Sequence, residues 1–286
     1  MNDTRQNKKK ALDRIIERID FPKDAVKKIK SAFAGLRPEE YPDDMGAFLD
    51  IKTAIPAWRG LKEKLAPDPD NMKILSLMLY ALSFTYDNYQ KAGIPDEIFN
   101  ATIGCYNRFL REHYAGYGRW AFDRDWWTHL QIAMTIFRVG ELEYEMKRDQ
   151  NDKFVSIHIP SDTVFTMERI KDSLARSRAF FRDYFPEYGD VEYRCRSWLL
   201  SPALKKMLPE GSNILAFQSL FDFTGEDCSS SGYIEWIFKR KYEDFRDLPE
   251  DTTLQRNLKK YLLAGNILSV GKGVLKKELL FTGQEK

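Results

Sequence analysis

Hydrophobic residues in the first half of the chain recur every three or four positions, which is the spacing of one face of an α-helix. This spacing predicts two short helices at the amino end, the second starting at Pro22, then a longer helix that ends at Gly93 and another that begins at Pro95. Proline is favoured at helix starts and glycine just beyond helix ends, so these boundaries agree with the pattern. We therefore expect residues 1–135 to form an all-helical domain.

From Gly140 onward the hydrophobic period shortens to two. Leu142, Tyr144 and Met146 alternate with charged residues, and the polar segment 149–152 separates this run from a second one at 154–159. Alternation of this kind predicts two half-buried strands joined by a turn. We expect residues 136–286 to form a second domain, a mixed β-sheet flanked by helices, which makes the whole chain α+β.

The second domain continues with further predicted elements. They are a helix capped by Asp162 or Thr163, a strand at 191–200, capped helical segments that start at Ser201 and Ser212, a strand from Tyr233 to Phe238 and a helix from Thr252 to Ala264. The strand at 191–200 places Tyr193 and Cys195 on one face because side chains alternate along a strand.

Composition adds limits on function. The chain has 45 Lys and Arg against 43 Asp and Glu, a net charge of +2, which is too small a field to favour nucleic acid or an anionic membrane as partner. No stretch is long and apolar enough to span a bilayer, so we expect a cytoplasmic protein. The 3 cysteines form no CxxC pair and the 3 histidines lack metal-ligand spacing, so neither disulfides nor a metal site are expected.

Several ordered segments resemble one family. GELEYE, IHIPSD, YRCRSWLLSPAL, SNILAFQSLF and LPEDTTLQRNLKKYLLAGN are similar to segments of the bacterial acyltransferase-domain proteins, in which a helical N-terminal domain precedes a GNAT-like acyl-CoA N-acyltransferase domain. The resemblance covers the whole chain and is most specific at residues 138–265. It implies direct transfer of an acyl group from acyl-CoA to a small amine.

The resemblance also implies where acyl-CoA binds. In this fold a strand that splays from its neighbour binds the pantetheine arm, and the helix that follows presents its N-terminus to the pyrophosphate. The residues at these positions are Ile157, His158 and Ile159 on the strand and Ser161, Asp162 and Thr163 in the turn. Asn213, at the start of a later helix, would contact the thioester carbonyl or cap its helix.

Two departures from the family pattern favour an alternative. The turn IPSDTVFTMER lacks the glycines that let a backbone approach a pyrophosphate, and SNILAFQSLFDF lacks the tyrosine that often protonates the leaving thiolate. The alternative is a noncatalytic GNAT-like module that binds a ligand or a protein.

The candidate bases are His158, Glu143 and Tyr193, each of which would project from the central sheet. A histidine held by structural hydrogen bonds and a solvated row of glutamates are the competing interpretations. Cys195 is a possible nucleophile if it meets His158, which would make the protein a cysteine-dependent acyl hydrolase; otherwise Cys195 is a packing residue.

Overall fold

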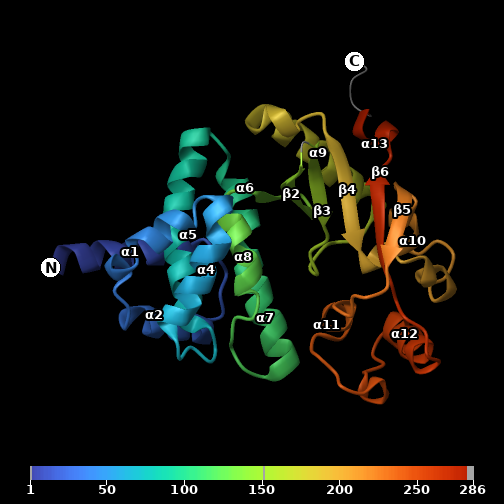
Figure 1. Ribbon diagram of the computed structural model, residues 1–286, viewed down its shortest axis with the longest axis horizontal. Helices are drawn as coiled ribbons and strands as arrows, with labels where there is room; N and C mark the ends of the chain where they lie inside the picture. The colour runs from blue at the N-terminus through green and yellow to red at the C-terminus, as the bar shows by residue number, and fades with distance from the viewer. Residues whose placement is uncertain (1, 151, 282–286) are drawn as a thin grey trace. The chain divides into compact units, whose positions relative to one another are not determined.

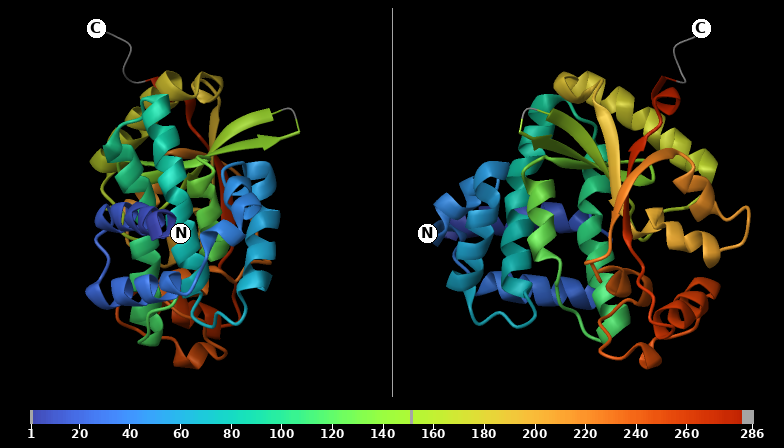
Figure 2. Two further views of the ribbon diagram at one scale, coloured as in Figure 1. Left: turned by 90° about the vertical axis from the view of Figure 1, so that its left-hand side faces the viewer. Right: turned by 45° about the vertical axis from the view of Figure 1, so that its right-hand side comes forward.

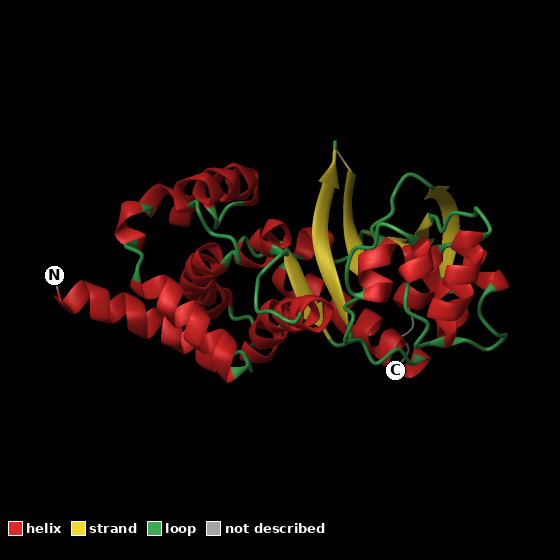
Figure 3. Ribbon diagram, turned by 90° about the horizontal axis from the view of Figure 1, so that it is seen from below, coloured by secondary structure: helices red, strands yellow, loops and turns green. Residues whose placement is uncertain are grey.

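The computed structural model describes residues 2–150 and 152–281, which fold as two compact units (Figure 1). The first unit is Met1–Phe137 and the second is Arg138–Lys286. Helices build the first unit, and a β-sheet with helices builds the second (Figure 3). The α+β class with a helical amino-terminal part, predicted from the change of hydrophobic period, is confirmed.

The helical unit is a set of short and medium helices. Within the described residues they are α1 (Asn2–Glu17), α2 (Lys23–Ala34), the 3₁₀ turn η1 (Pro38–Glu40), α3 (Pro42–Ala47), α4 (Ile51–Leu65), α5 (Met72–Ala92), α6 (Asp96–Ile103), α7 (Cys105–Tyr117) and α8 (Asp125–Ile132).

Helix α5 forms the core of this unit. Leu75, Leu79 and Leu82 are fully buried, and the helix packs against α1, α2 and α8. It ends as predicted at Gly93, whose φ of 70° lies in the left-handed region that glycine adopts at little cost. The single helix predicted after Pro95 is interrupted at Gly104, because a glycine inside a helix weakens it.

The second unit contains the strands and the remaining helices. In chain order they are β1 (Ile136–Val139), β2 (Leu142–Asp149), β3 (Asp152–His158), α9 (Met167–Tyr184), η2 (Pro186–Tyr188), β4 (Glu192–Ser197), η3 (Trp198–Leu200), η4 (Pro202–Lys206), α10 (Asn213–Gln218), β5 (Phe221–Asp227), α11 (Tyr233–Phe238), η5 (Phe245–Asp247), α12 (Thr253–Leu263), β6 (Val270–Leu275) and α13 (Lys277–Phe281).

The sheet has the strand order β1-β2-β3-β4-β6-β5. β2 and β3 form the predicted antiparallel hairpin, which projects from the sheet (Figure 2). β3 and β4 are parallel and are connected by α9, whereas β4 with β6 and β6 with β5 are antiparallel. The parallel pair therefore lies inside a sheet whose other registered pairs run antiparallel.

Helix α9 covers one face of the sheet. Ser173 on this helix accepts a hydrogen bond from the backbone N–H of Leu142 at 3.1 Å, and its hydroxyl lies 2.8 Å from the hydroxyl of Tyr144. The approach is close because Gly140, at φ +67°, has no side chain: a Cβ there would lie 3.0 Å from the Cβ of Ser173. A hydrogen bond and a glycine thus fix α9 on the sheet.

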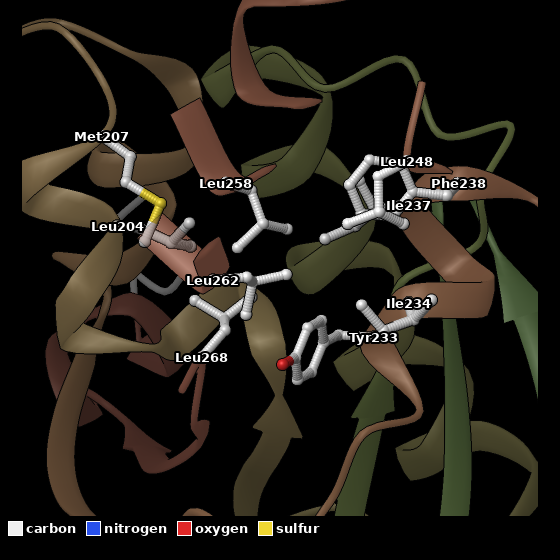
Figure 4. Packing of buried hydrophobic residues seen from close by; sticks show 10 residues of the cluster. All are labelled: Leu204, Met207, Tyr233, Ile234, Ile237, Phe238, Leu248, Leu258, Leu262 and Leu268. Carbon is white, nitrogen blue, oxygen red and sulfur yellow. The ribbon is translucent and has the colours of Figure 1, made fainter. Parts of the chain in front are cut away.

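The long connection between β5 and β6 packs with Leu204 and Met207, which precede β5, into one hydrophobic cluster. Figure 4 shows Tyr233, Ile234, Ile237 and Phe238 of α11 facing Leu258 and Leu262 of α12. The strand predicted over Tyr233 to Phe238 is therefore wrong: this segment is a helix, because its buried residues recur at positions i, i+1, i+4 and i+5 and meet a second helix.

No helix in residues 2–150 and 152–281 combines the length and the apolar character that crossing a lipid bilayer requires.

Candidate active site

The parallel strands β3 and β4 part at one end. Their register runs from Phe154 opposite Glu192 to Ile157 opposite Cys195 and stops there. β4 nevertheless continues for two residues, in which Arg196 and Ser197 remain paired with β6. His158, the last residue of β3, lies immediately beyond the final β3–β4 pair. The pairing of β3 with β4 therefore ends beside His158, and we call this the open end of the parallel pair. The family resemblance predicts that the two strands splay here.

The register sorts the candidate residues onto two faces. Tyr144, Ile157 and Cys195 are paired in a row across β2, β3 and β4, and they face α9; we call this the α9 face. Glu143 is paired with His158 and Glu145 with Ser156, one position out of phase, so they point to the opposite side, the carboxylate face.

His158 and Glu145 form a hydrogen-bonded pair on the carboxylate face. His158 Nε2 lies 2.8 Å from Glu145 Oε2, and the side chains are 26% and 8% exposed. Burial acts to raise the pKa of the Glu145 carboxyl, but the hydrogen bond and charge of His158, with a smaller effect of Lys147, outweigh it and hold this pKa below its usual value. Glu145 is thus a buried, ionised acceptor for the imidazole.

Glu143 lies directly across the hairpin from His158 and is only 4% exposed. Glu145 is 6% exposed. The alternative that these glutamates form a solvated row is therefore wrong for both positions. Two buried carboxylates and one imidazole gather at the open end of β3, where a cationic or proton-releasing group would be attracted.

Tyr193 does not lie near His158, Glu143 and Glu145. It is paired with Val155, three residues before His158, and therefore lies on the α9 face. It is 1% exposed, and its hydroxyl accepts a 3.4 Å hydrogen bond from Ser177 of α9. Burial raises the pKa of Tyr193 to about 12, which disfavours the tyrosinate that a base would need. The geometry separates Tyr193 from the other two candidate bases.

Cys195 also lies on the α9 face, opposite in direction to His158. Its side chain is 2% exposed, and burial raises the pKa of its thiol to about 12. A nucleophilic cysteine needs a thiolate and an adjacent imidazole. The thiol of Cys195 is held in its neutral form by burial, and the imidazole of His158 lies on the other face of the sheet. The structure therefore contradicts the Cys195–His158 pair and with it the cysteine-dependent hydrolase; Cys195 is a packing residue.

We expect Cys195→Ser to keep acyl transfer within about tenfold of the unchanged protein, because it alters packing and not a reacting group. Initial rates with saturating acyl donor, and the lack of inactivation by iodoacetamide at this buried position, are the measurements. A fall of about a thousandfold in the rate of a folded variant would support covalent catalysis by Cys195 instead.

The turn after β3 contains Ser161, Asp162 and Thr163, but the helix begins later than predicted. α9 starts at Met167 and is capped by Thr166, whose hydroxyl accepts the backbone N–H of Arg169 at 3.4 Å. The prediction of Asp162 or Thr163 as the cap is wrong because Thr166, three residues before Arg169, satisfies the N3 amide.

Ionic contacts hold this turn. Asp162 is paired with Arg138 at 2.8 Å. Glu141 accepts the backbone N–H of Val164 and the guanidinium of Arg169, both at 2.9 Å. The backbone amide of Val164 in this glycine-free segment therefore already has a carboxylate oxygen as its partner.

Helix α10 borders the open end of β4. Ser212 caps it by accepting the N–H of Ile214, which leaves Asn213 as the first helical residue and not the cap. Gln218 donates from Nε2 to the carbonyls of Leu199 and Ser201, just beyond β4, at 2.9 and 3.0 Å. These bonds place α10 beside the end of β4.

The sequence pattern indicated Glu145 only as one member of a row of glutamates and gave no indication of Arg138 or Arg169. The hairpin register contained the signal for Glu145: with Asp149 opposite Asp152, His158 falls opposite Glu143, one diagonal step from Glu145. The roles of Arg138 and Arg169 depend on loop geometry that spacing does not reveal.

Comparison with known proteins identifies both units. Residues 10–134 match the model of an N-acyltransferase N-terminal domain, and residues 136–275 match that of a GNAT-like C-terminal domain. No curated protein matches the sequence.

Three solved structures are similar over most of the chain. An acyltransferase in complex with decanoyl-CoA and teicoplanin, and an acyltransferase mutant in complex with octanoyl-CoA, are each 20% identical, with a TM-score of 0.79, over 92% of this chain and 86% of theirs. An acyltransferase in complex with CoA and 10C-teicoplanin covers the same shares at 20% identity with a TM-score of 0.78. At this identity the likeness shows a shared fold.

Proposed function

We propose that this chain, which belongs to the N-acyltransferases that join a helical N-terminal domain to a GNAT-like C-terminal domain, transfers an acyl group directly from acyl-CoA to an amine. The observation that carries the proposal is the position of His158, paired with a buried carboxylate, at the open end of the parallel strands β3 and β4. The family resemblance assigns this end of β3 to the pantetheine arm of acyl-CoA, which supports the proposal.

In this proposal the pantetheine arm lies beyond the last β3–β4 pair, Ile157 with Cys195. The backbone of His158 and Ile159, on the side that β4 no longer occupies, pairs with the amides of the arm, as a neighbouring strand would. The pyrophosphate lies at the turn of Ser161, Asp162 and Thr163 and the N-terminus of α9, where backbone N–H groups and the helix dipole favour an anion. Asn213, at the start of α10, faces the thioester end.

The chemistry is a single acyl transfer. The amine nitrogen attacks the thioester carbonyl carbon, the C–S bond breaks, and CoA leaves as a thiolate. His158 takes the proton that the amine loses, and that proton ends on CoA, so the products are an amide and CoA–SH. Glu143, buried opposite His158, attracts the amine in its cationic form, which releases one proton to solvent before the neutral nitrogen attacks.

The similar structures support a proposal for the donor and acceptor classes. Those proteins were crystallised with octanoyl-CoA, decanoyl-CoA and teicoplanin. We propose that this chain likewise prefers a donor with an acyl chain of about eight to ten carbons. The acceptor is an amine, either free or carried on a larger molecule.

The proposal predicts that acyl-CoA stabilises the protein. A ligand at about 100 times its dissociation constant adds roughly 2.7 kcal/mol to the free energy of unfolding. Thermal unfolding should therefore shift upward with decanoyl-CoA, more than with acetyl-CoA, because each buried methylene contributes about 0.8 kcal/mol. Free decanoate at the same concentration is the matched control.

Unchanged melting with every acyl-CoA would contradict the proposed donor. Binding that is never followed by amide formation, monitored by mass spectrometry with a panel of amines, would instead support the noncatalytic alternative. The glycine-free turn and the absent tyrosine make this second measurement necessary.

A further inference from the structure

Glu145 occupies a defined place in the hairpin. It lies on β2, paired in register with Ser156 of β3, and its Oε2 contacts both His158 Nε2 at 2.8 Å and Lys147 Nζ at 3.3 Å. Its side chain is 8% exposed, whereas that of Lys147 is 44% exposed. A buried carboxylate held between an imidazole and a lysine is ionised, so both of its oxygens are hydrogen-bond acceptors.

This contact determines how the imidazole carries its proton. An ionised carboxylate only accepts, so the ring nitrogen that faces it must be the donor. In the neutral ring the other nitrogen then holds the lone pair. Resting on the proposed function, we infer that Glu145 is a positioning residue: its carboxylate fixes the Nε2–H tautomer of His158 and so presents Nδ1 as the atom that takes the proton from the amine.

The other charged groups on this face do not supply the same constraint. They include Glu143 and Lys147 on β2, and Arg194 and Arg196 on β4. Arg194 pairs with Glu192 and Asp152, and Arg196 pairs with Asp227 at 2.6 Å, so each arginine is held away by its own carboxylate. Glu143 lies directly opposite His158 in the hairpin, and in the proposed mechanism it attracts the amine.

The test compares Glu145→Gln with the unchanged protein in two measurements: the tautomer of the His158 ring and the rate of acyl transfer. The chain has 3 histidines, so ¹⁵N-histidine labelling, with His158→Gln for assignment, resolves the ring nitrogens of His158 without any ligand. We expect the unchanged protein to hold the Nε2–H form and Glu145→Gln to lose it. We also expect kcat to fall by about 100-fold while KM for acyl-CoA stays within about threefold.

Two further variants serve as controls for this interpretation. Lys147→Gln removes a charge from the same carboxylate but leaves the imidazole contact, so both tautomer and kcat should stay unchanged. Glu145→Asp keeps the carboxylate and should keep the Nε2–H form, which answers the objection that any change at this buried site perturbs the fold.

The outcomes separate this inference from the proposed function. An unaltered tautomer in Glu145→Gln, or an altered tautomer with an unaltered kcat, would overturn the role of Glu145. Full activity in His158→Gln would overturn the base assignment of the proposed function, while the ligand-free tautomer measurement would still report whether Glu145 orients the ring.

Discussion

Replacing His158 with glutamine is expected to lower kcat for amide formation by about 10²- to 10⁴-fold, the usual contribution of a positioned general base. Glutamine keeps the length and polarity of the side chain but cannot accept a proton from the amine. The measurement is the initial rate with decanoyl-CoA and an amine acceptor, together with the dissociation constant of the acyl-CoA. The dissociation constant should change little, because the proposal assigns the pantetheine arm to backbone groups and the phosphates to the turn before α9.

Ser156→Ala is the matched control for this substitution. Ser156 lies two residues earlier on the same strand and the same face, paired with Glu145, but it has no place in the proposed chemistry. Its rate should resemble that of the unchanged protein. A His158→Gln protein that is folded, binds acyl-CoA and keeps its full rate would show that the amine proton goes to another group.

Much of the fold follows from periodicity. The hairpin of β2 and β3 was predictable because charged and apolar residues alternate strictly around a polar turn. Helix α5 was predictable because an apolar stripe ends at a glycine, and α12 because Thr252 and Gln255 form a capping box. In each case the local pattern and the tertiary packing favour the same structure.

The remaining elements depend on tertiary contacts. The segment of α11 is rich in aromatic and β-branched residues, which favours a strand, but the core it shares with α12 makes it a helix. β5 and β6 escaped prediction because charged residues and glycines interrupt their apolar pattern. Such strands form because the neighbouring strands offer backbone partners.

The site was predicted in part, for a similar reason. Sequence alone selects His158 and Glu143, since both lie on strands with clear alternation. It also selects Tyr193 and Cys195, because spacing within one strand does not say which face of the sheet that strand presents to its neighbours. Only the register between β3 and β4 shows that these two residues point toward α9, away from His158.

Gly271 on β6 is the position where we expect the largest loss of stability from a small change. It is paired with Ser197 of β4 and Glu226 of β5, and the turn η3 passes directly over it. A Cβ at Gly271 would lie 2.5 Å from the carbonyl carbon of Leu200 and closer still to its oxygen. This obstacle is backbone, which cannot rotate away as a side chain does, so Gly271→Ala should lower the free energy of unfolding by about 3 kcal/mol.

Two other glycines set the scale for that experiment. At Gly273 a Cβ would meet the Cβ of Phe221 at 2.9 Å, so Gly273→Ala should cost less than Gly271→Ala. At Gly60, inside α4, a Cβ would meet nothing within 4 Å, so Gly60→Ala should stabilise its helix by about 0.5–1 kcal/mol. Urea unfolding followed by circular dichroism would rank the three variants. Equal urea midpoints for Gly271→Ala and the unchanged protein would mean that η3 does not pack directly on β6. The backbone that follows β4 would then take a different path from the one described above.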